Sequence, residues 1–277
     1  MNIRTQFVAL QTILIKETLR FLRIWIQTIL PPAVTTALYF IIFGTLIGAQ
    51  IGPVEGLSYP HIALGLIMMV VITNNAYSNV VSSFFSAKFQ RHIEEMLVSP
   101  LPNTIIVLGF VGGGVARGLA VGGVVAAVSP FFTDLPGRHP LITLAVIVLT
   151  SVLFAALAGL LNGIYAKSFD DISVVPTFVL TSLIHLGGIF YSIKMLPPFW
   201  QAASLFNPIL YMINAFRYGI LGVSDIDIHF AFAIPLFVSV LFGYSLWLLR
   251  RGTGIRAVKI LLPIKVQQMY VVRVIRA

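Results

Sequence analysis

Few side chains in this sequence have the type and spacing that chemistry requires. The five histidines are scattered along the chain: His61, His92, His139, His185 and His229. No two of them lie at metal-ligand spacing, and the chain has no cysteine to supply a thiolate ligand or nucleophile. The three glycines at 112–114 are not followed by the lysine of a phosphate-binding loop. The sequence therefore predicts no catalytic residue, no metal ion and no cofactor bound by this chain.

Polar residues inside long apolar runs are the more informative feature. Arg117 is the single charge within the run 104–132, and Asn74, Asn75 and Asn79 fall in the second half of the run 60–85. Side chains of this kind are costly in lipid, so we expect them to face protein or water. Arg117 could line a pathway for an anionic or polar substrate, or it could hydrogen-bond to helix carbonyls. We take these four residues as candidates for a translocation path.

Three further features of the sequence can each be explained either by a structural role or by a functional one. His185 could bond to a neighbouring helix or act in a proton relay. Asp170 and Asp171 could cap a helix N-terminus or contact a partner protein. The glycines at 112–114 favour close helix packing over ligand binding.

The segment 88–103, KFQRHIEEMLVSPLPN, follows the second apolar run. Ile93, Met96 and Leu97 recur at helical spacing, with Arg91 and the pair Glu94–Glu95 between them. An amphipathic helix here could dock into the groove of another protein. The alternative is a solvated loop resting on lipid headgroups.

The composition places these residues in a membrane. The chain is 58% hydrophobic and 10% charged, whereas soluble domains are roughly 45–50% apolar and about 25% charged. A spanning helix takes about 20 mostly apolar residues. Six such spans take up most of the 277 residues, so we expect no separate soluble domain. We expect an all-α membrane protein with about six transmembrane helices, at 27–48, 60–85, 104–132, 140–165, 172–191 and 229–249.

Two segments outside these spans also read as membrane-associated. Residues 1–24 place Phe7, Leu10, Leu14 and Phe21 at helical spacing among basic residues, which predicts an amphipathic interfacial helix. Residues 194–227 mix apolar, aromatic and proline residues, which predicts short half-inserted outer helices before the last span. The expected domain covers 1–252, followed by a basic cytoplasmic tail, 253–277, of unknown role.

The net charge of +9 is better explained by membrane topology than by binding to nucleic acid. Of 18 Lys and Arg residues, 14 fall in segments on the side of the N-terminus and three in segments on the other side. The positive-inside rule then places both termini in the cytoplasm. The basic residues lie beside apolar spans, where anionic lipid headgroups attract them.

Several stretches together resemble a known family. They are RIWIQTILPPAVTTALYFIIFG, SSFFSAKFQRHIEEMLVSPLP, GFVGGGVARG, GLLNGIYAKSFDDISVVPTFVLTSLIHLGGIFYSIKMLPPFWQ and FNPILYMINAFRYG. Over 24–252 the chain resembles the ABC-2 type permease family, the membrane subunits of certain ATP-binding-cassette transporters, and most of all its bacterial inner-membrane members. Two features depart from the family pattern: Leu64–Gly65 stands where Pro-Gly is common, and the tail after residue 252 looks foreign.

The resemblance implies a mechanism. Two permeases pair with two separate ATPase subunits, which bind ATP and magnesium. The N-terminal helix and the element 90–99 would meet the ATPase, so Arg91, Glu94, Glu95 and Leu97 are the expected coupling residues. Residues 194–219 would be the half-inserted outer helices. Family substrates include drugs, lipids and polysaccharides, usually exported.

Two other functions remain open at this stage. An ion-coupled secondary transporter would place carboxylates or histidines at mid-membrane, and the predicted spans hold almost no carboxylate. A lipid-acting membrane enzyme would cluster His, Asp or Glu at one membrane face, where this chain offers only Lys167, Asp170 and Asp171.

Overall fold

The structure is a computed structural model that describes residues 3–42, 59–132, 137–189, 191–227, 229 and 233–252. In this part of the chain all regular secondary structure is helical and no strand occurs. The predicted tail, 253–277, lies outside the described residues, as does the end of the first predicted span after residue 42. The all-α class predicted from the sequence is confirmed.

The helices follow one another along the chain, with π-helical or 3-10 turns labelled η. They are α1 (Ile3–Arg23), α2 (Trp25–Thr28), α3 (Leu30–Tyr39), α5 (Tyr59–Phe89), α6 (His92–Val98), α7 (Asn103–Val128), η2 (Ser129–Phe131), α8 (Pro140–Leu153), η3 (Phe154–Gly159), α9 (Leu160–Tyr165), α10 (Asp171–Val174), η4 (Val175–Leu180), α11 (Thr181–Leu186), η5 (Ile193–Met195), α12 (Pro198–Leu205), α13 (Pro208–Leu221) and α14 (Ala233–Arg251).

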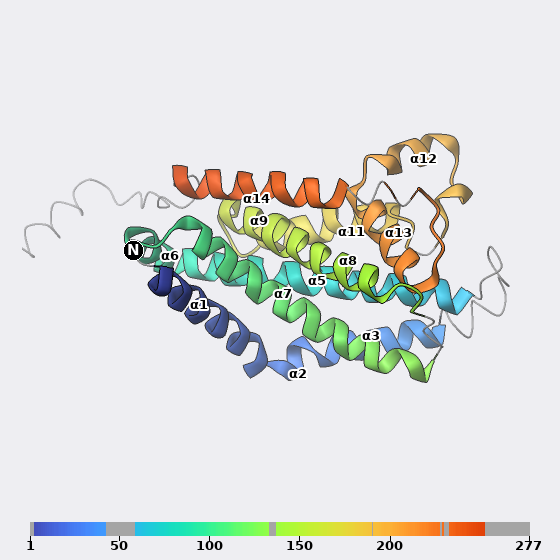
Figure 1. Ribbon diagram of the computed structural model, residues 1–277, viewed down its shortest axis with the longest axis horizontal. Coiled ribbons are helices and arrows are strands. Elements are labelled where there is room, and N and C mark those ends of the chain that lie inside the picture. The colour runs from blue at the N-terminus through green and yellow to red at the C-terminus, as the bar shows by residue number, and fades with distance from the viewer. Residues whose placement is uncertain are drawn as a thin grey trace, which may run out of the picture.

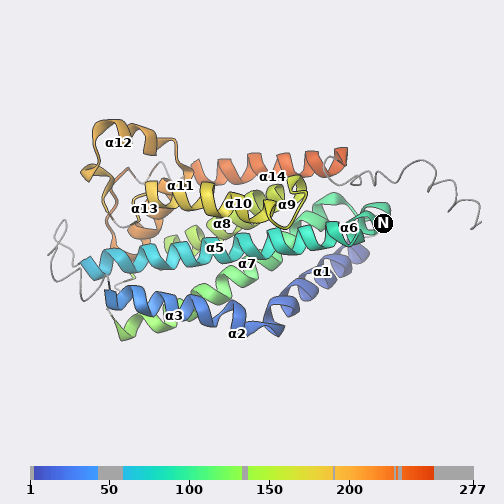
Figure 2. The ribbon, with the colours of Figure 1, turned by 180° about the vertical axis from the view of Figure 1, so that it is seen from behind.

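The long helices lie side by side along the longest axis of the molecule (Figures 1 and 2). α5 and α7 form the centre, with α8 and α14 on one side and α1 and α3 on the other. The N-terminus, α6 and the end of α14 lie at one end of the bundle, and α12 and α13 lie at the other. Two distinct ends are the arrangement that a membrane-crossing bundle requires.

Three described segments are long and apolar enough to cross a membrane: Trp25–Ile42, Asn103–Phe131 and Ala233–Arg251. Shorter apolar helices cover 140–150, 156–165 and 171–186, which overlap the predicted fourth and fifth spans. These two spans each contain a π-helical turn, η3 and η4. In η4, Pro176 has no N–H to donate, and the N–H of Thr181 bonds to the Pro176 carbonyl five residues back.

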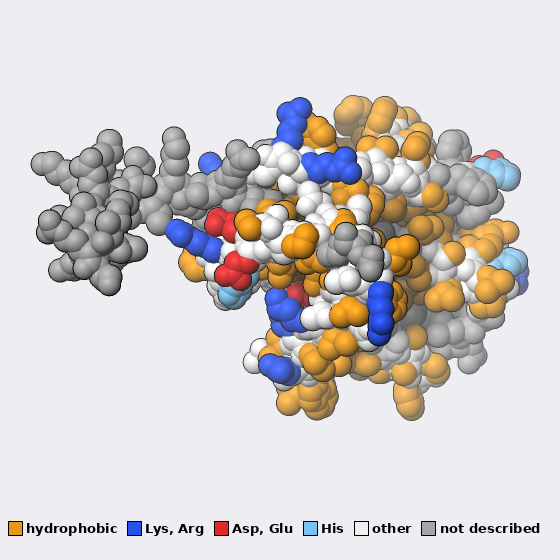
Figure 3. Space-filling view, turned by 60° about the vertical axis from the view of Figure 1, so that its left-hand side comes forward, with side chains coloured by type: hydrophobic (Ala, Val, Ile, Leu, Met, Phe, Trp, Pro, Cys, Tyr) orange, Lys and Arg blue, Asp and Glu red, His pale blue; other side chains and the backbone are white. Residues whose placement is uncertain are grey.

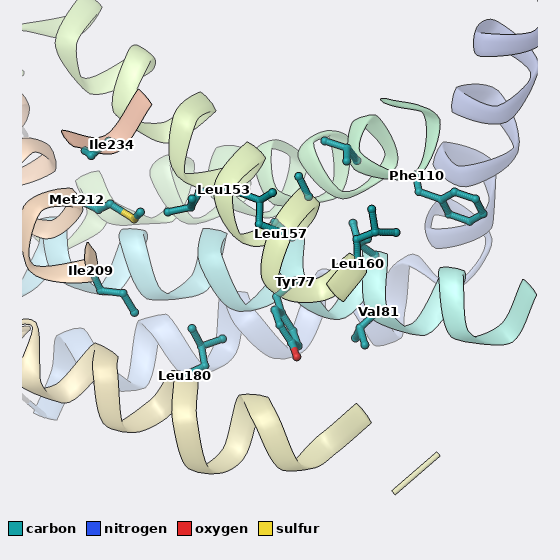
Figure 4. Packing of buried hydrophobic residues seen from close by; sticks show 14 of the residues in the cluster. Tyr77, Val81, Phe110, Leu153, Leu157, Leu160, Leu180, Ile209, Met212 and Ile234 are labelled. Atoms are coloured by element: carbon teal, nitrogen blue, oxygen red, sulfur yellow. The ribbon is translucent and has the colours of Figure 1, made fainter. Parts of the chain in front are cut away.

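A continuous apolar core joins α5 to the helices around it. Tyr77 and Val81 of α5 lie opposite Leu157 of η3 and Leu160 of α9 (Figure 4). Gly159 makes this approach possible, because a Cβ there would lie 2.9 Å from the carbonyl oxygen of Tyr77. η3 therefore packs directly against the backbone of α5.

The segment 194–227 forms short helices, as predicted, and is held by a buried ion pair. α13 begins at Asn207, whose side chain accepts the N–H of Ile209 at 3.0 Å, and ends at Gly222 in the left-handed region, with φ 74°. Arg217 of α13 pairs with Asp225 at 2.6 Å and donates to the Gly188 carbonyl at 3.0 Å. These bonds tie α13 to the loop that follows it and to the end of α11.

Candidate functional site

The N-terminal helix packs on a row of glycines in α7. A Cβ built at Gly109 would clash with Ile13, and one at Gly113 would lie 2.5 Å from the Cβ of Glu17. Ile13, Glu17 and Phe21 form the buried stripe of α1. Close helix packing, the structural explanation given for these glycines, therefore operates at this contact.

α1 also presents apolar side chains outward. Val8, Ile15, Leu19 and Leu22 lie on one exposed face, 43–53% accessible. Phe7, predicted on the apolar face of an interfacial helix, is 65% exposed. α1 is thus apolar on two faces. One face packs against the bundle, and the other is exposed.

Glu17 is a fully buried carboxylate at this contact. The Ser83 hydroxyl of α5 donates to its Oε2 at 2.5 Å, and Nε of Arg20 lies 3.3 Å from the same oxygen. Burying a carboxylate is costly unless a counter-charge and hydrogen bonds replace its water. Arg20 and Ser83 supply both.

Arg20 also reaches across to α5. Its Nη2 donates to the backbone carbonyl and to Oδ1 of Asn79, each at 2.9 Å. One helical turn earlier on α5, Oδ1 of Asn75 accepts a hydrogen bond from Nη2 of Arg117 in α7 at 3.3 Å. We call Glu17, Arg20, Asn75, Asn79, Ser83 and Arg117 the polar cluster; it joins α1, α5 and α7.

The polar cluster has more positive charge and more donors than it can satisfy internally. It holds two guanidinium groups, those of Arg20 and Arg117, against one carboxylate, that of Glu17. Nε of Arg117 and Nδ2 of Asn79 are buried without a hydrogen-bond acceptor, and Nε of Arg20 has only its ion pair with Glu17, whose Oε1 is an unpaired acceptor. The arrangement is suited to binding an acceptor group from outside the chain.

The structure brings three of the four predicted path residues into this cluster. Asn75 and Asn79 are buried, and Arg117 is half-buried. Asn74 lies apart, exposed on another face of α5. The sequence reasoning did not select Glu17, although it interrupts the spacing of the apolar stripe between Leu14 and Phe21, and that interruption was the available signal.

The predicted coupling residues lie on and beside α6. Arg91 precedes the helix in the left-handed region, with φ 64°, and is exposed. Ile93 is fully buried and Leu97 packs on the core, while Glu95 is exposed and Glu94 half-buried. Figure 3 shows acidic and basic side chains together at this end of the molecule. The segment is therefore a packed amphipathic helix with a charged outer face.

The turn between α9 and α10 is organised by Asp171. Its carboxylate accepts the N–H groups of Lys167 at 2.8 Å and Ser168 at 3.1 Å, and the Ser168 hydroxyl accepts the Asp171 N–H at 3.2 Å. Those bonds, first among them the one from Lys167, lower the pKa of Asp171 below its ordinary value. The Asp171 carboxylate therefore stabilises the turn before α10, whereas Asp170, at the N-cap position, makes no side-chain capping bond.

Metal-ligand groups and Lys88 are the other places where a site could lie among the described residues. Over the ranges that the structure covers, no three His, Asp or Glu residues are grouped to hold a metal ion. Lys88 is occupied at the end of α9, where its Nζ donates to the carbonyls of Ile164 at 2.6 Å and Ala166 at 2.7 Å. The polar cluster is thus the candidate site.

Helices long and apolar enough to cross a membrane, packed around a polar cluster, indicate an integral membrane protein. Comparison with known families gives the more specific class. The family model for the ABC-2 type transporter matches residues 8–221, so the chain belongs to the ABC-2 type transporter family. The family resemblance inferred from the sequence is confirmed.

Two kinds of curated relative are similar to this chain. It is 56% identical over 253 residues to the inner membrane transport permease YadH of Escherichia coli K12, covering 91% of this chain and 98% of the relative. It is 28% identical over 216 residues to nodulation protein J of Rhizobium leguminosarum bv. trifolii, covering 77% and 82%. The first similarity confirms that the resemblance is to bacterial inner-membrane members of the family.

Proposed function

We propose that this chain is the permease subunit of an ATP-driven exporter in the bacterial inner membrane. The family match and the 56% identity to an inner membrane transport permease support the class. Export would be driven by a separate ATPase subunit that binds ATP and magnesium, since the sequence has no phosphate-binding loop of its own. The substrate class would be a lipid, a drug or a polysaccharide.

The proposed topology has six crossings and both termini in the cytoplasm. The common position of the N-terminus, α6 and the end of α14 at one end of the bundle supports this. The excess of Lys and Arg assigns that end to the cytoplasm. A second copy of the chain would complete the path, and ATP-driven rearrangement of the two copies would shift access between membrane faces.

The observation that carries the proposal is the placement of α6. Its inner side chain, Ile93, is fully buried in the bundle core, so movement of α6 would be transmitted to α5. Its outer side carries Glu95, exposed beside Arg91. We assign Arg91, Glu94, Glu95 and Leu97 to the ATPase contact, and Asn74, Asn75, Asn79 and Arg117 to the substrate path.

The test is ATP hydrolysis by the partner ATPase in liposomes, with and without this chain. We expect the chain to form a complex that changes the hydrolysis rate, and the double variant Glu94→Ala, Glu95→Ala to abolish that change. Asp227→Ala is the control, because it removes an exposed carboxylate from the connection between α13 and α14, away from α6 in the sequence. Failure to form a complex with any ATPase would reject the proposal.

One observation, the buried carboxylate of Glu17, bears on the alternative function of an ion-coupled secondary transporter. This buried carboxylate was not counted in the predicted spans, yet it lies between α5 and α7. Its Oε2 is occupied by Arg20 and Ser83, which counts against ion exchange at this carboxylate in this conformation. Transport that follows an ion gradient without the ATPase would favour this alternative, and turnover of a lipid by the purified chain would favour the enzyme.

A further inference from the structure

The charge balance of the polar cluster points to the chemical class of the substrate. Glu17 neutralises Arg20, with which it forms an ion pair at 3.3 Å. Arg117 has no carboxylate ion-pair partner among the described residues, and its Nη2 donates to the amide oxygen of Asn75 at 3.3 Å. One positive charge is therefore left over in a largely buried setting, where a charge without a partner is costly.

The unused hydrogen-bond donors lie in the same place. A guanidinium has five N–H donors, and Nε of Arg117 is buried without an acceptor. Nδ2 of Asn79, one turn along α5 from Asn75, is also buried without an acceptor. A group that offers several oxygen acceptors and a negative charge would satisfy both, and phosphate and carboxylate are the groups that bind guanidinium most strongly.

The polar cluster opens at Arg20, whose side chain is 36% exposed, so the cluster is not sealed by protein. The face of α1 that points away from Glu17 is apolar, with Ile15, Leu19 and Leu22 43–49% exposed. In a bilayer the exposed face of α1 would lie against acyl chains. An anion that arrives attached to an acyl chain can occupy both environments at once.

We propose that Arg117, with Nδ2 of Asn79, binds the anionic phosphate or carboxylate group of an amphiphilic substrate at the polar cluster. This inference rests on the proposed function, because it names the substrate class of the same transporter. It assigns Arg20 and Glu17 a positioning role: the pair holds Asn79 and leaves Arg117 as the charge available to the ligand.

The test uses the purified full-length chain in detergent and native mass spectrometry with dioleoyl phosphatidic acid. Wild-type protein should bind the lipid saturably, and Arg117→Gln should bind it at least about tenfold more weakly. Arg117→Lys should retain part of the affinity, because it keeps the charge without the guanidinium geometry. Arg250→Gln, which removes an exposed charge from the end of α14, should bind like wild type.

Two further ligands distinguish the source of the anion. Dioleoylglycerol has the same chains without the phosphate, and equal binding of it by wild type would overturn the proposal even if Arg117→Gln does not fold. Unchanged phosphatidic acid affinity in a folded Arg117→Gln variant would overturn it as well. Inorganic phosphate that displaces the lipid at similar concentration would support the anion site and assign it to a soluble ligand. Because no ATPase is present, a negative result in the hydrolysis experiment would reject the exporter function and leave this binding result unaffected.

Discussion

Nη1 of Arg217 lies 2.6 Å from Oδ2 of Asp225, and the two side chains are only 5% and 2% exposed. The carboxylate also accepts the N–H of Ile193 at 3.2 Å, so the pair joins α13 to η5 as well as to its own loop. Breaking one half of such a pair leaves a buried charge without a partner, which is more damaging than removing both.

The first prediction concerns this pair. We expect Asp225→Asn to lower the free energy of unfolding by about 3–5 kcal/mol, because Arg217 keeps its charge in a buried site. Thermal unfolding in detergent measures the effect. The double variant Arg217→Met, Asp225→Leu should be substantially more stable than Asp225→Asn alone, and Asp227→Asn, at an exposed position, should unfold like wild type. If the single and double variants lose equal stability, the pair has no electrostatic role.

The second prediction concerns the glycine contact between α1 and α7. Gly113→Ala would place a Cβ 2.5 Å from the Cβ of Glu17, which cannot yield by a side-chain rotation alone. We expect a loss of about 1–3 kcal/mol in the free energy of unfolding. Gly123→Ala in the same helix is the matched control, since nothing lies within 4 Å of its Cβ. It should be neutral or stabilising by up to about 1 kcal/mol; equal losses in the two variants would show that α1 does not pack here.

The third prediction is a coupling energy between Glu17 and Ser83. Their hydrogen bond at 2.5 Å is buried and charge-assisted, so a double-mutant cycle with Glu17→Ala and Ser83→Ala should give about 1.5–3 kcal/mol of coupling in the free energy of unfolding. The same cycle with Ser82→Ala should give less than about 0.5 kcal/mol, because Ser82 is bonded to Arg20 and to the backbone and not to Glu17. Coupling of similar size in both cycles would contradict the observed geometry.

The fourth prediction concerns acid pH at the turn before α10. The pKa of Asp171 is lowered in the folded state by the N–H groups of Lys167 and Ser168, so its stabilising effect is present above the unfolded pKa of about 3.9 and is lost as pH falls through the folded pKa. Hydrogen exchange of these two amides should show protection at pH 5 that disappears with acidification below about pH 4. Asp171→Asn should remove most of the protection and its pH dependence, and Asp170→Asn should leave both in place.

Apolar composition and periodicity predicted the helical class, the last span and the short helices of 194–227, because burial in lipid demands long apolar helices. They could not predict the partner of each helix. Glu17 and Ser83 are 66 positions apart, and a periodic pattern tells which face is buried without telling what covers it. The interfacial position of α1 stays a prediction, and the packing of its buried stripe on α7 could not be inferred from its own residues.

The polar cluster was predicted in part for the same reason. Asn75, Asn79 and Arg117 stand out against apolar neighbours in sequence, so their burial could be inferred. Arg20 stands in a segment where basic residues are common, and nothing in the sequence separates it from the others there. Only the fold shows that it crosses to the carbonyl of Asn79. The π-helical turns were also missed, because a single extra residue in a turn leaves the apolar run unbroken.

The π-helical turn η3 limits how the length of this chain can change during evolution. A π turn holds an extra residue relative to an α-helix, so deletion of one residue within 154–159 would restore a regular helix. Everything beyond it would then rotate by about 100°, since each residue of an α-helix turns by that angle. Gly159 and Gly163 would leave the surface of α5, and bulkier neighbours would meet Tyr77 and Phe84 in their place. Insertions and deletions in this family should therefore be absent from η3 and collect in the loops.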